Sequence, residues 1–160
     1  MAPTHEGNWE LMADTRSPTR KAAETAKWAT TMTKWLVTWT KSRTAWQLVE
    51  FSGPGGRESR GIVDLLAIRK DHRTPGADLK RGDLFEIVLL QIKGGSAIWP
   101  SRDDILRLRQ VARHHRAREI VLSDWQKGNQ PTLYRLARRL PANFDPKGVW
   151  REVTADVVFG

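Results

Sequence analysis

Three polar residues interrupt apolar stretches of the sequence, and their types could support chemistry. Asp64 lies in the middle of GIVDLLAI, although aspartate is disfavoured in strands and is costly to bury without a partner. Gln91 and Lys93 end the stretch LFEIVLLQIK, two residues apart and therefore on one face of a strand. If the two stretches are neighbouring strands, a carboxylate, an amide and an ammonium converge at one end of a sheet. Two interpretations are open: an Asp64–Lys93 ion pair with Gln91 as an incidental partner, or a functional site.

The composition limits the chemistry available to such a site. The chain has 160 residues, no cysteine and four histidines, which excludes a disulfide scaffold, a thiolate zinc site and a cysteine nucleophile. Any metal ion would therefore be held mostly by oxygen ligands. The sequence also lacks a Gly-x-Ser-x-Gly motif, a P-loop and a dinucleotide-binding fingerprint.

No stretch of the sequence resembles a membrane span or a signal peptide. The longest uninterrupted aliphatic run, Ile87 to Leu90, is far shorter than the ~18 apolar residues that a span needs. The N-terminal segment is acidic, with Glu6, Glu10 and Asp14, which is unlike a signal peptide. We expect a cytoplasmic protein with no membrane partner.

The charge of the chain points to a polyanionic partner. Lysine and arginine number 27 against 18 acidic residues, for a net charge of +9. The excess is concentrated in residues 15–45, with seven basic residues and one acid, and in 127–151, with six and one, whereas the centre is nearly neutral. A phosphate backbone binds such basic segments through counterion release. Nucleic acid is therefore the leading candidate, and a merely solubilising surface is the alternative.

Hydrophobic periodicity predicts one α/β domain over residues 17–160, preceded by a loose arm over 1–16. Helices are expected at 18–41, 101–115 and 132–140, and strands at 45–51, 61–68, 84–93, 119–123 and 149–159. Turn-forming residues separate the first strands at 52–56 and 71–82. The strand at 119–123 is reached through a helix, as in a parallel crossover.

Two of the expected helices carry further predictions. The first has Trp28, Met32, Trp35 and Trp39 at helical spacing, which favours a core-facing stripe over a stacking platform for single-stranded bases. The helix at 132–140 is expected to turn its leucines inward and its arginines outward. The resulting order is α-β-β-β-α-β-α-β, a sheet with helices on its faces.

Placed on these elements, the polar residues resemble the pattern of the PD-(D/E)xK nuclease superfamily. The pattern is a helix carrying an acid, a glycine shortly before an aspartate, and an apolar strand that ends in acid-x-lysine. This sequence supplies Glu24, the segment Arg57–Asp64, and Gln91-Ile92-Lys93. The likeness is to the branch that includes Holliday junction resolvases and related restriction-like endonucleases, and it covers roughly residues 18–125.

The resemblance implies a restriction endonuclease-like core, a central mixed sheet flanked by helices, and metal-dependent hydrolysis of DNA phosphodiester bonds, with branched DNA as a candidate substrate. It implies Mg²⁺ or Mn²⁺ held by Asp64, Gln91 and a further acid, with Lys93 orienting water or offsetting negative charge. Gln91 replaces the usual acid and should hold the ion more weakly. The alternative is therefore a non-catalytic DNA-binding protein on a nuclease fold.

The second acid and the DNA contacts are expected in the basic segments and loops. Glu24 is the choice closest to the family pattern, ahead of Glu50 and Glu58. A homodimer would suit an enzyme that cuts both strands, and nucleoid association would follow from binding DNA. The candidate backbone contacts are Arg20, Lys21, Arg57, Arg60, Arg135, Arg138 and Arg139.

Overall fold

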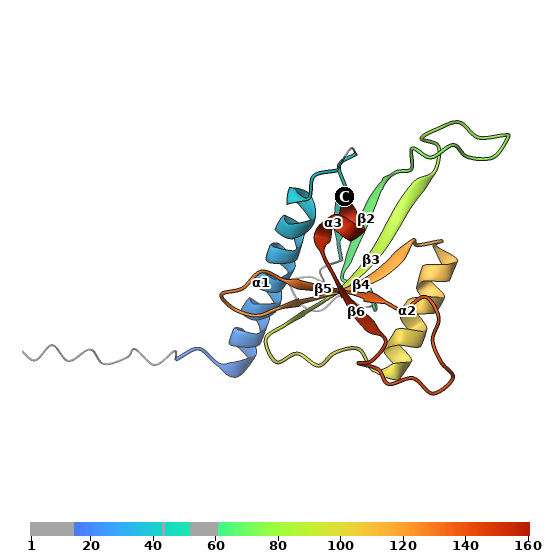
Figure 1. Ribbon diagram of the computed structural model, residues 1–160. Helices are drawn as coiled ribbons and strands as arrows, with labels where there is room; N and C mark the ends of the chain where they lie inside the picture. Colours follow the sequence, from blue (N-terminus) through green and yellow to red (C-terminus); the bar gives the residue numbers. More distant parts are fainter. Residues whose placement is uncertain (1–14, 43, 52–60) are drawn as a thin grey trace, which may run out of the picture.

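The computed structural model describes residues 15–42, 44–51 and 61–160, and its elements form one sheet with helices on both sides (Figure 1). The helices are α1 (Pro18–Trp39), α2 (Arg102–His114) and α3 (Ala155–Phe159). The strands are β1 (Gln47–Glu50), β2 (Leu65–Lys70), β3 (Phe85–Gly94), β4 (Glu119–Trp125), β5 (Thr132–Leu136) and β6 (Trp150–Val153).

The six strands lie in the sheet in chain order, β1 to β6. Every neighbouring pair is antiparallel except β3 and β4, which are parallel and are connected through α2. The α/β class, the mixed sheet and the parallel crossover are thus as predicted. A capping box begins α2: the Ser101 hydroxyl accepts a hydrogen bond from the backbone of Asp104, whose carboxylate accepts one from the backbone of Ser101.

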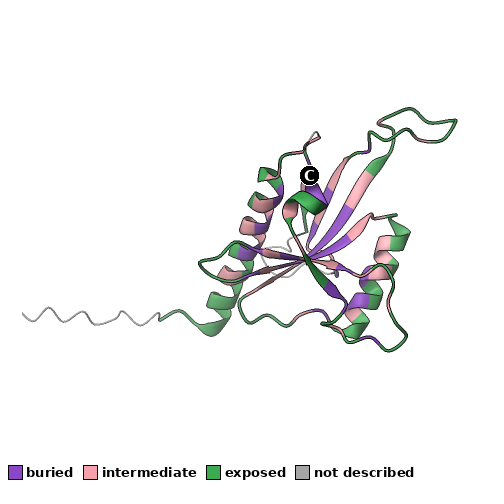
Figure 2. Ribbon diagram, in the orientation of Figure 1, coloured by how far each residue is buried: buried purple, intermediate pink, exposed green. Residues whose placement is uncertain are grey.

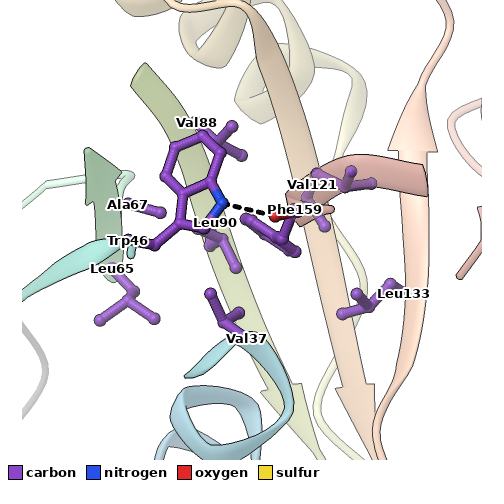
Figure 3. Close-up of a cluster of buried hydrophobic side chains, with 10 residues drawn as sticks. Val37, Trp46, Leu65, Ala67, Val88, Leu90, Val121, Leu133 and Phe159 are labelled. Carbon is purple, nitrogen blue, oxygen red and sulfur yellow. Dashed lines mark hydrogen bonds between the residues drawn. The ribbon is translucent and has the colours of Figure 1, made fainter. Parts of the chain in front are cut away.

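Two apolar clusters fix which helix covers which face of the sheet. On one face, Leu65, Leu90 and Val121 pack with Val37 of α1 and Phe159 of α3 (Figure 3). Trp46 joins this cluster and donates a 2.8 Å hydrogen bond from its indole nitrogen to the carbonyl of Phe159. On the other face, Leu122 and Leu136 pack with Ile105 and Leu108 of α2. Because side chains alternate along a strand, each face can be assigned residue by residue.

The helix predicted at 132–140 is wrong, because residues 132–136 form strand β5. Leu133 belongs to the cluster under α1, whereas Leu136 belongs to the cluster under α2. Two leucines three residues apart are both buried in a helix that packs on one side, and they are also both buried in a strand that is covered on both faces. The tail also differs from the prediction of a strand through 149–159: β6 ends at Val153 and α3 follows. The chain therefore follows the order α-β-β-β-α-β-β-β-α.

The tryptophan stripe of α1 was predicted to face the core, and this is also wrong. Trp28, Trp35 and Trp39 are 52%, 45% and 72% exposed. The buried face consists of the smaller residues Ala29, Thr33 and Val37, which are the purple bands of this helix in Figure 2. Small side chains let the helix approach the sheet closely: a Cβ built on Gly94 would lie 3.0 Å from the Cβ of Ala29. The tryptophans are too large for that gap.

Candidate functional site

The sheet brings Asp64, Gln91 and Lys93 to the same end of neighbouring strands, as predicted. β2 and β3 pair through Leu65 and Leu90, so one step further the register sets Asp64 beside Gln91. The backbone N–H of Asp64 donates a 3.0 Å hydrogen bond to the carbonyl of Leu90. Since Leu65 and Leu90 face α1, alternation turns the three polar side chains toward the face covered by α2.

The Asp64 carboxylate is held by the backbone and does not pair with Lys93. Its Oδ2 accepts a 2.7 Å hydrogen bond from the N–H of Ile92. No ion pair within 4 Å joins Asp64 to Lys93, although the structure describes both residues. The simple ion-pair interpretation of these two residues is therefore wrong.

Gln91 lies between them and carries an unmatched polar atom. The residue is only 7% exposed, and its side-chain oxygen Oε1 has no hydrogen-bond partner among the described residues. An amide oxygen buried without a partner costs about 1–3 kcal/mol. An oxygen in this state is suited to a ligand that accepts its lone pairs.

Lys93 is partly buried, and it has acidic residues near it without forming an ion pair with any described one. In the β3–β4 register it is the partner of Asp124. It also faces the first turn of α2: the hydrogen bond from the Ser101 backbone lowers the pKa of Asp104, burial opposes this, and the positive charges of Arg107 and Lys93 contribute smaller decreases. Its ammonium makes no ion pair or hydrogen bond with any described residue, so it remains able to engage an anion.

The donor set of Asp64 and Gln91 fits a hard divalent cation. Carboxylate and amide oxygens are the ligands that Mg²⁺ and Mn²⁺ prefer, and the unmatched Oε1 of Gln91 is the observation that supports the fit. Within 15–42, 44–51 and 61–160, however, no three acidic or histidine residues gather as a ligand cluster. Asp64 is therefore not part of a three-residue ligand cluster within these ranges.

The three candidates for that second acid lie elsewhere or outside the description. Glu24 projects from α1, which packs on the opposite face of the sheet, and its carboxylate pairs with Arg16 and Arg20. Glu50 pairs with Lys34 of the same helix at 2.9 Å. Glu58 lies outside the described residues. A role for Glu24 would require its side chain to approach Asp64 and Gln91 around the end of the sheet.

The predicted DNA contacts occupy different environments. Arg20, Lys21, Arg138 and Arg139 are exposed, while Arg57 and Arg60 lie outside the described residues. Arg135 is expected to point outward but instead pairs with Glu119 across the strands, at 2.6 and 2.9 Å. It also lines a cavity of about 300 Å³ between the end of α2 and β5, whose other basic residues are Arg109, Arg113, Arg116, Arg118 and Arg138.

Sequence reasoning missed this arginine-lined cavity and a second cavity beside α1. The second has a volume of about 490 Å³. It is lined by two tryptophans, Trp28 and Trp125, by the acid Glu24 and by the cations Arg16, Lys21 and Lys127. Trp125 comes from the end of β4. The signal in the sequence is that Trp125 and Lys127 lie at the end of an apolar run. This signal does not indicate which residues pack against them.

Comparison with known proteins returns no match: no family model, curated protein or solved structure is similar to this chain. Among the described residues, no helix combines the length and the apolar character of a membrane span.

Proposed function

We propose that this chain is a metal-dependent DNA endonuclease with a restriction endonuclease-like core, acting on branched DNA. The observation that carries the proposal is the buried, unmatched Oε1 of Gln91 next to Asp64 and Lys93. A hydrolase that cuts phosphodiesters needs oxygen ligands for a cation and a positive charge near the phosphate, and these three residues supply both kinds of group.

The arrangement of the elements supports the proposal. The family pattern calls for an acid-bearing helix, three strands, a helix and a parallel strand, and α1 to β4 follow that order with β3 and β4 parallel. Asp64 directly precedes β2 and Lys93 is the penultimate residue of β3, so both lie at one end of the sheet. Sheet order alone does not define a function, so the site residues carry the argument.

Each residue has a distinct role in the proposed reaction. Asp64 and Gln91 would hold Mg²⁺ or Mn²⁺, and the bound ion would supply Lewis-acid chemistry that lowers the pKa of water and offsets phosphate charge. The N–H of Ile92 fixes the Asp64 carboxylate through Oδ2. Lys93 would orient the attacking water or stabilise the negative charge that develops on the phosphate. Exposed Arg20, Lys21 and Arg138 would hold the DNA backbone, and the protein would be nucleoid-associated.

One observation favours the second candidate, a non-catalytic DNA-binding protein. Gln91 replaces an acid, and no cluster of three acidic or histidine ligands exists in the described part of the chain. Such a protein would bind DNA in a salt-dependent manner but would not bind Mn²⁺ through Asp64.

Plasmid nicking separates the candidates. We expect the protein to nick supercoiled plasmid with Mg²⁺ or Mn²⁺, and Asp64→Asn and Lys93→Met each to lower the rate about 100-fold or more. Asp64→Asn keeps an oxygen for the Ile92 N–H and should fold normally. The matched controls are Asp78→Asn and Lys70→Met, which change exposed residues at the other end of the sheet and should cut at the wild-type rate.

Two results would count against this proposal. Unchanged nicking by both Asp64→Asn and Lys93→Met would remove these residues from the site. No nicking by the wild type, together with Mn²⁺ binding that does not depend on Asp64 even when DNA is present, would favour the non-catalytic protein. Calorimetric titration of Mn²⁺ into wild type and Asp64→Asn provides that measurement.

A further inference from the structure

The exposed tryptophans of α1 form a continuous stripe. At ~100° per residue, Trp28, Trp35 and Trp39 fall within about 40° of one another around the helix and span about 16 Å along it. The rings of Trp35 and Trp39 are stacked, with centroids 5.8 Å apart and planes 15° apart. Large aromatic surfaces left in water by a folded domain mark an interaction site.

The stripe leads into the cavity of about 490 Å³ beside the candidate site. Trp28 lines this cavity together with Trp125, which reaches it from the end of β4. Trp125 is the register partner of Gly94, and its carbonyl accepts a 3.0 Å hydrogen bond from the N–H of Gly95. Gly94 directly follows Lys93 in β3. The cavity and the candidate site therefore share one end of the sheet, on opposite faces.

Basic residues accompany the aromatic rings. Lys27 precedes Trp28 on the exposed surface of α1, and Lys127 lines the cavity two residues after Trp125. Neither lysine forms an ion pair with a residue in the described ranges. Indole rings flanked by cations are the combination that binds single-stranded nucleic acid, because bases stack on the rings and phosphates meet the charges.

A second copy of the chain is a poorer occupant. In a symmetric dimer the same surface patch faces itself. Along α1 the charged residues are Arg20, Lys21, Lys27 and Lys34 against the single acid Glu24, so a self-pairing of this helix would bring like charges together. A polyanion removes that repulsion.

We infer that the stripe of Trp28, Trp35 and Trp39, with the Trp28–Trp125 cavity, binds a single-stranded segment of DNA. This inference rests on the proposed function. The substrate would be DNA with an unpaired strand next to the cleaved phosphate, such as a flap or a splayed arm. The strand would pass along α1 and enter the cavity at the end of β3, where Gly94 and Gly95 pack against Thr25.

Strand binding can be measured without metal, so its failure is distinct from a failure of cleavage. The experiment measures the fluorescence anisotropy of a labelled 16-nucleotide oligo(dT) in EDTA. We expect the protein to bind this oligo(dT) more tightly than it binds a 16-base-pair duplex, and the binding should quench tryptophan fluorescence. Trp28→Ala and Trp35→Ala should each weaken oligo(dT) binding about tenfold, because stacking on one base contributes about that factor. Trp28→Phe should retain most of the affinity.

The matched control is Phe85→Ala, which removes another exposed aromatic residue from the start of β3 and should bind oligo(dT) like the wild type. Wild-type affinity in both Trp28→Ala and Trp35→Ala would overturn the inference, as would a tryptophan-dependent dimer in sedimentation equilibrium. With Mg²⁺, the wild type should cut a splayed duplex faster than a blunt one, and Trp28→Ala should lose that discrimination while Phe85→Ala keeps it. Oligo(dT) binding without any cleavage would refute the nuclease proposal alone.

Discussion

The two ends of the central sheet treat their polar side chains in opposite ways. At the end where β3 and β4 begin, acids and bases are matched. The Glu86 carboxylate accepts hydrogen bonds from Arg69 at 2.6 Å and from Arg118 at 3.0 Å, and Glu119 is paired with Arg135. At the end where β3 and β4 finish, Gln91 has an unmatched oxygen and Lys93 has no ion-pair partner among the described residues.

The pKa of Glu86 shows how pairing with arginines stabilises a partly buried carboxylate. Burial raises the pKa of this carboxyl, but the hydrogen bond from Arg69 and the charges of Arg118 and Arg69 outweigh burial and lower it overall. Two guanidinium groups thus stabilise the ionised form of this partly buried carboxyl. Two buried nitrogens at this end have no hydrogen-bond partner in the described part of the chain, the Nε of Arg118 and the Nε1 of Trp150.

The comparison teaches where to look for a function. A matched group contributes to folding, whereas an unmatched buried polar group costs stability and persists where a ligand completes it. On that reasoning, the starts of β3 and β4 contribute to stability, and the end of β3 is where we propose a functional site. The same contrast predicts that substitutions at the two ends will have opposite effects on the free energy of unfolding.

The largest stability effect is expected at the matched end. Glu86→Gln keeps the size of the side chain, which is 10% exposed. It removes the counter-charge of Arg69 and the nearer of the two carboxylates that pair with Arg118. Removing one partner of a buried ion pair costs several kcal/mol, and we expect the free energy of unfolding in urea to fall by about 3 kcal/mol.

The control is Glu50→Gln, which breaks the exposed pair with Lys34. Exposed pairs contribute about 1 kcal/mol or less, so this variant should stay close to the wild type. Equal losses in Glu86→Gln and Glu50→Gln would show that the ends of the sheet are not distinguished by matching.

A smaller effect of opposite sign is expected at Gln91. Gln91→Leu removes an amide oxygen that has no partner and should raise the free energy of unfolding by about 1 kcal/mol while abolishing Mn²⁺ binding. Thr33→Val provides the contrast. It removes a hydroxyl that is hydrogen-bonded to Ser123 at 2.6 Å, and should lower stability by about 1 kcal/mol. A loss of stability in Gln91→Leu as large as in Thr33→Val would mean that Gln91 is matched within the fold.

Much of the central sheet could be predicted because its strands are long apolar runs. The stretch at 84–93 is apolar on both faces, which is typical of a central strand, and β3 occupies Phe85–Gly94. The helix expected at 101–115 likewise corresponds to α2 at Arg102–His114. Gln91 and Lys93 stood out for the same physical reason: a polar residue inside an apolar strand is expensive unless it has a use. Asp64 was expected inside a strand at 61–68, but β2 begins at Leu65, so Asp64 directly precedes the strand.

Two errors arose where one spacing permits two structures. Leucines three residues apart in 132–136 are compatible with a helix covered on one side or with a strand covered on both, and only the neighbouring strands β4 and β6 decide. The face of α1 could not be read from its tryptophans, because Ala29 and Thr33 give an equally regular stripe. Which stripe is buried depends on the close approach of Gly94, a contact that local sequence does not reveal.

The smallest expected effect concerns pH and again lies at the matched end. The side-chain and backbone hydrogen bonds from Arg73 lower the pKa of Asp71 from 3.8 to about 2, with burial opposing them. Because the folded pKa is depressed, this contribution is fully present above about pH 4 and is lost as the pH falls toward 2. Its size is limited, since the Arg73 side chain is largely exposed.

Urea unfolding at pH 5 and pH 2.5 measures this contribution by comparing the wild type with Asp71→Asn. The wild type should be the more stable protein at pH 5. The difference should shrink at pH 2.5, because the carboxyl of the unfolded chain, with a pKa near 3.8, is then protonated and this favours unfolding. Asp78→Asn, on the same exposed loop, should follow the wild type at both values. A constant difference between wild type and Asp71→Asn would show that the carboxylate charge is not what Arg73 recognises, and matching by charge would then be confined to Glu86 and Glu119.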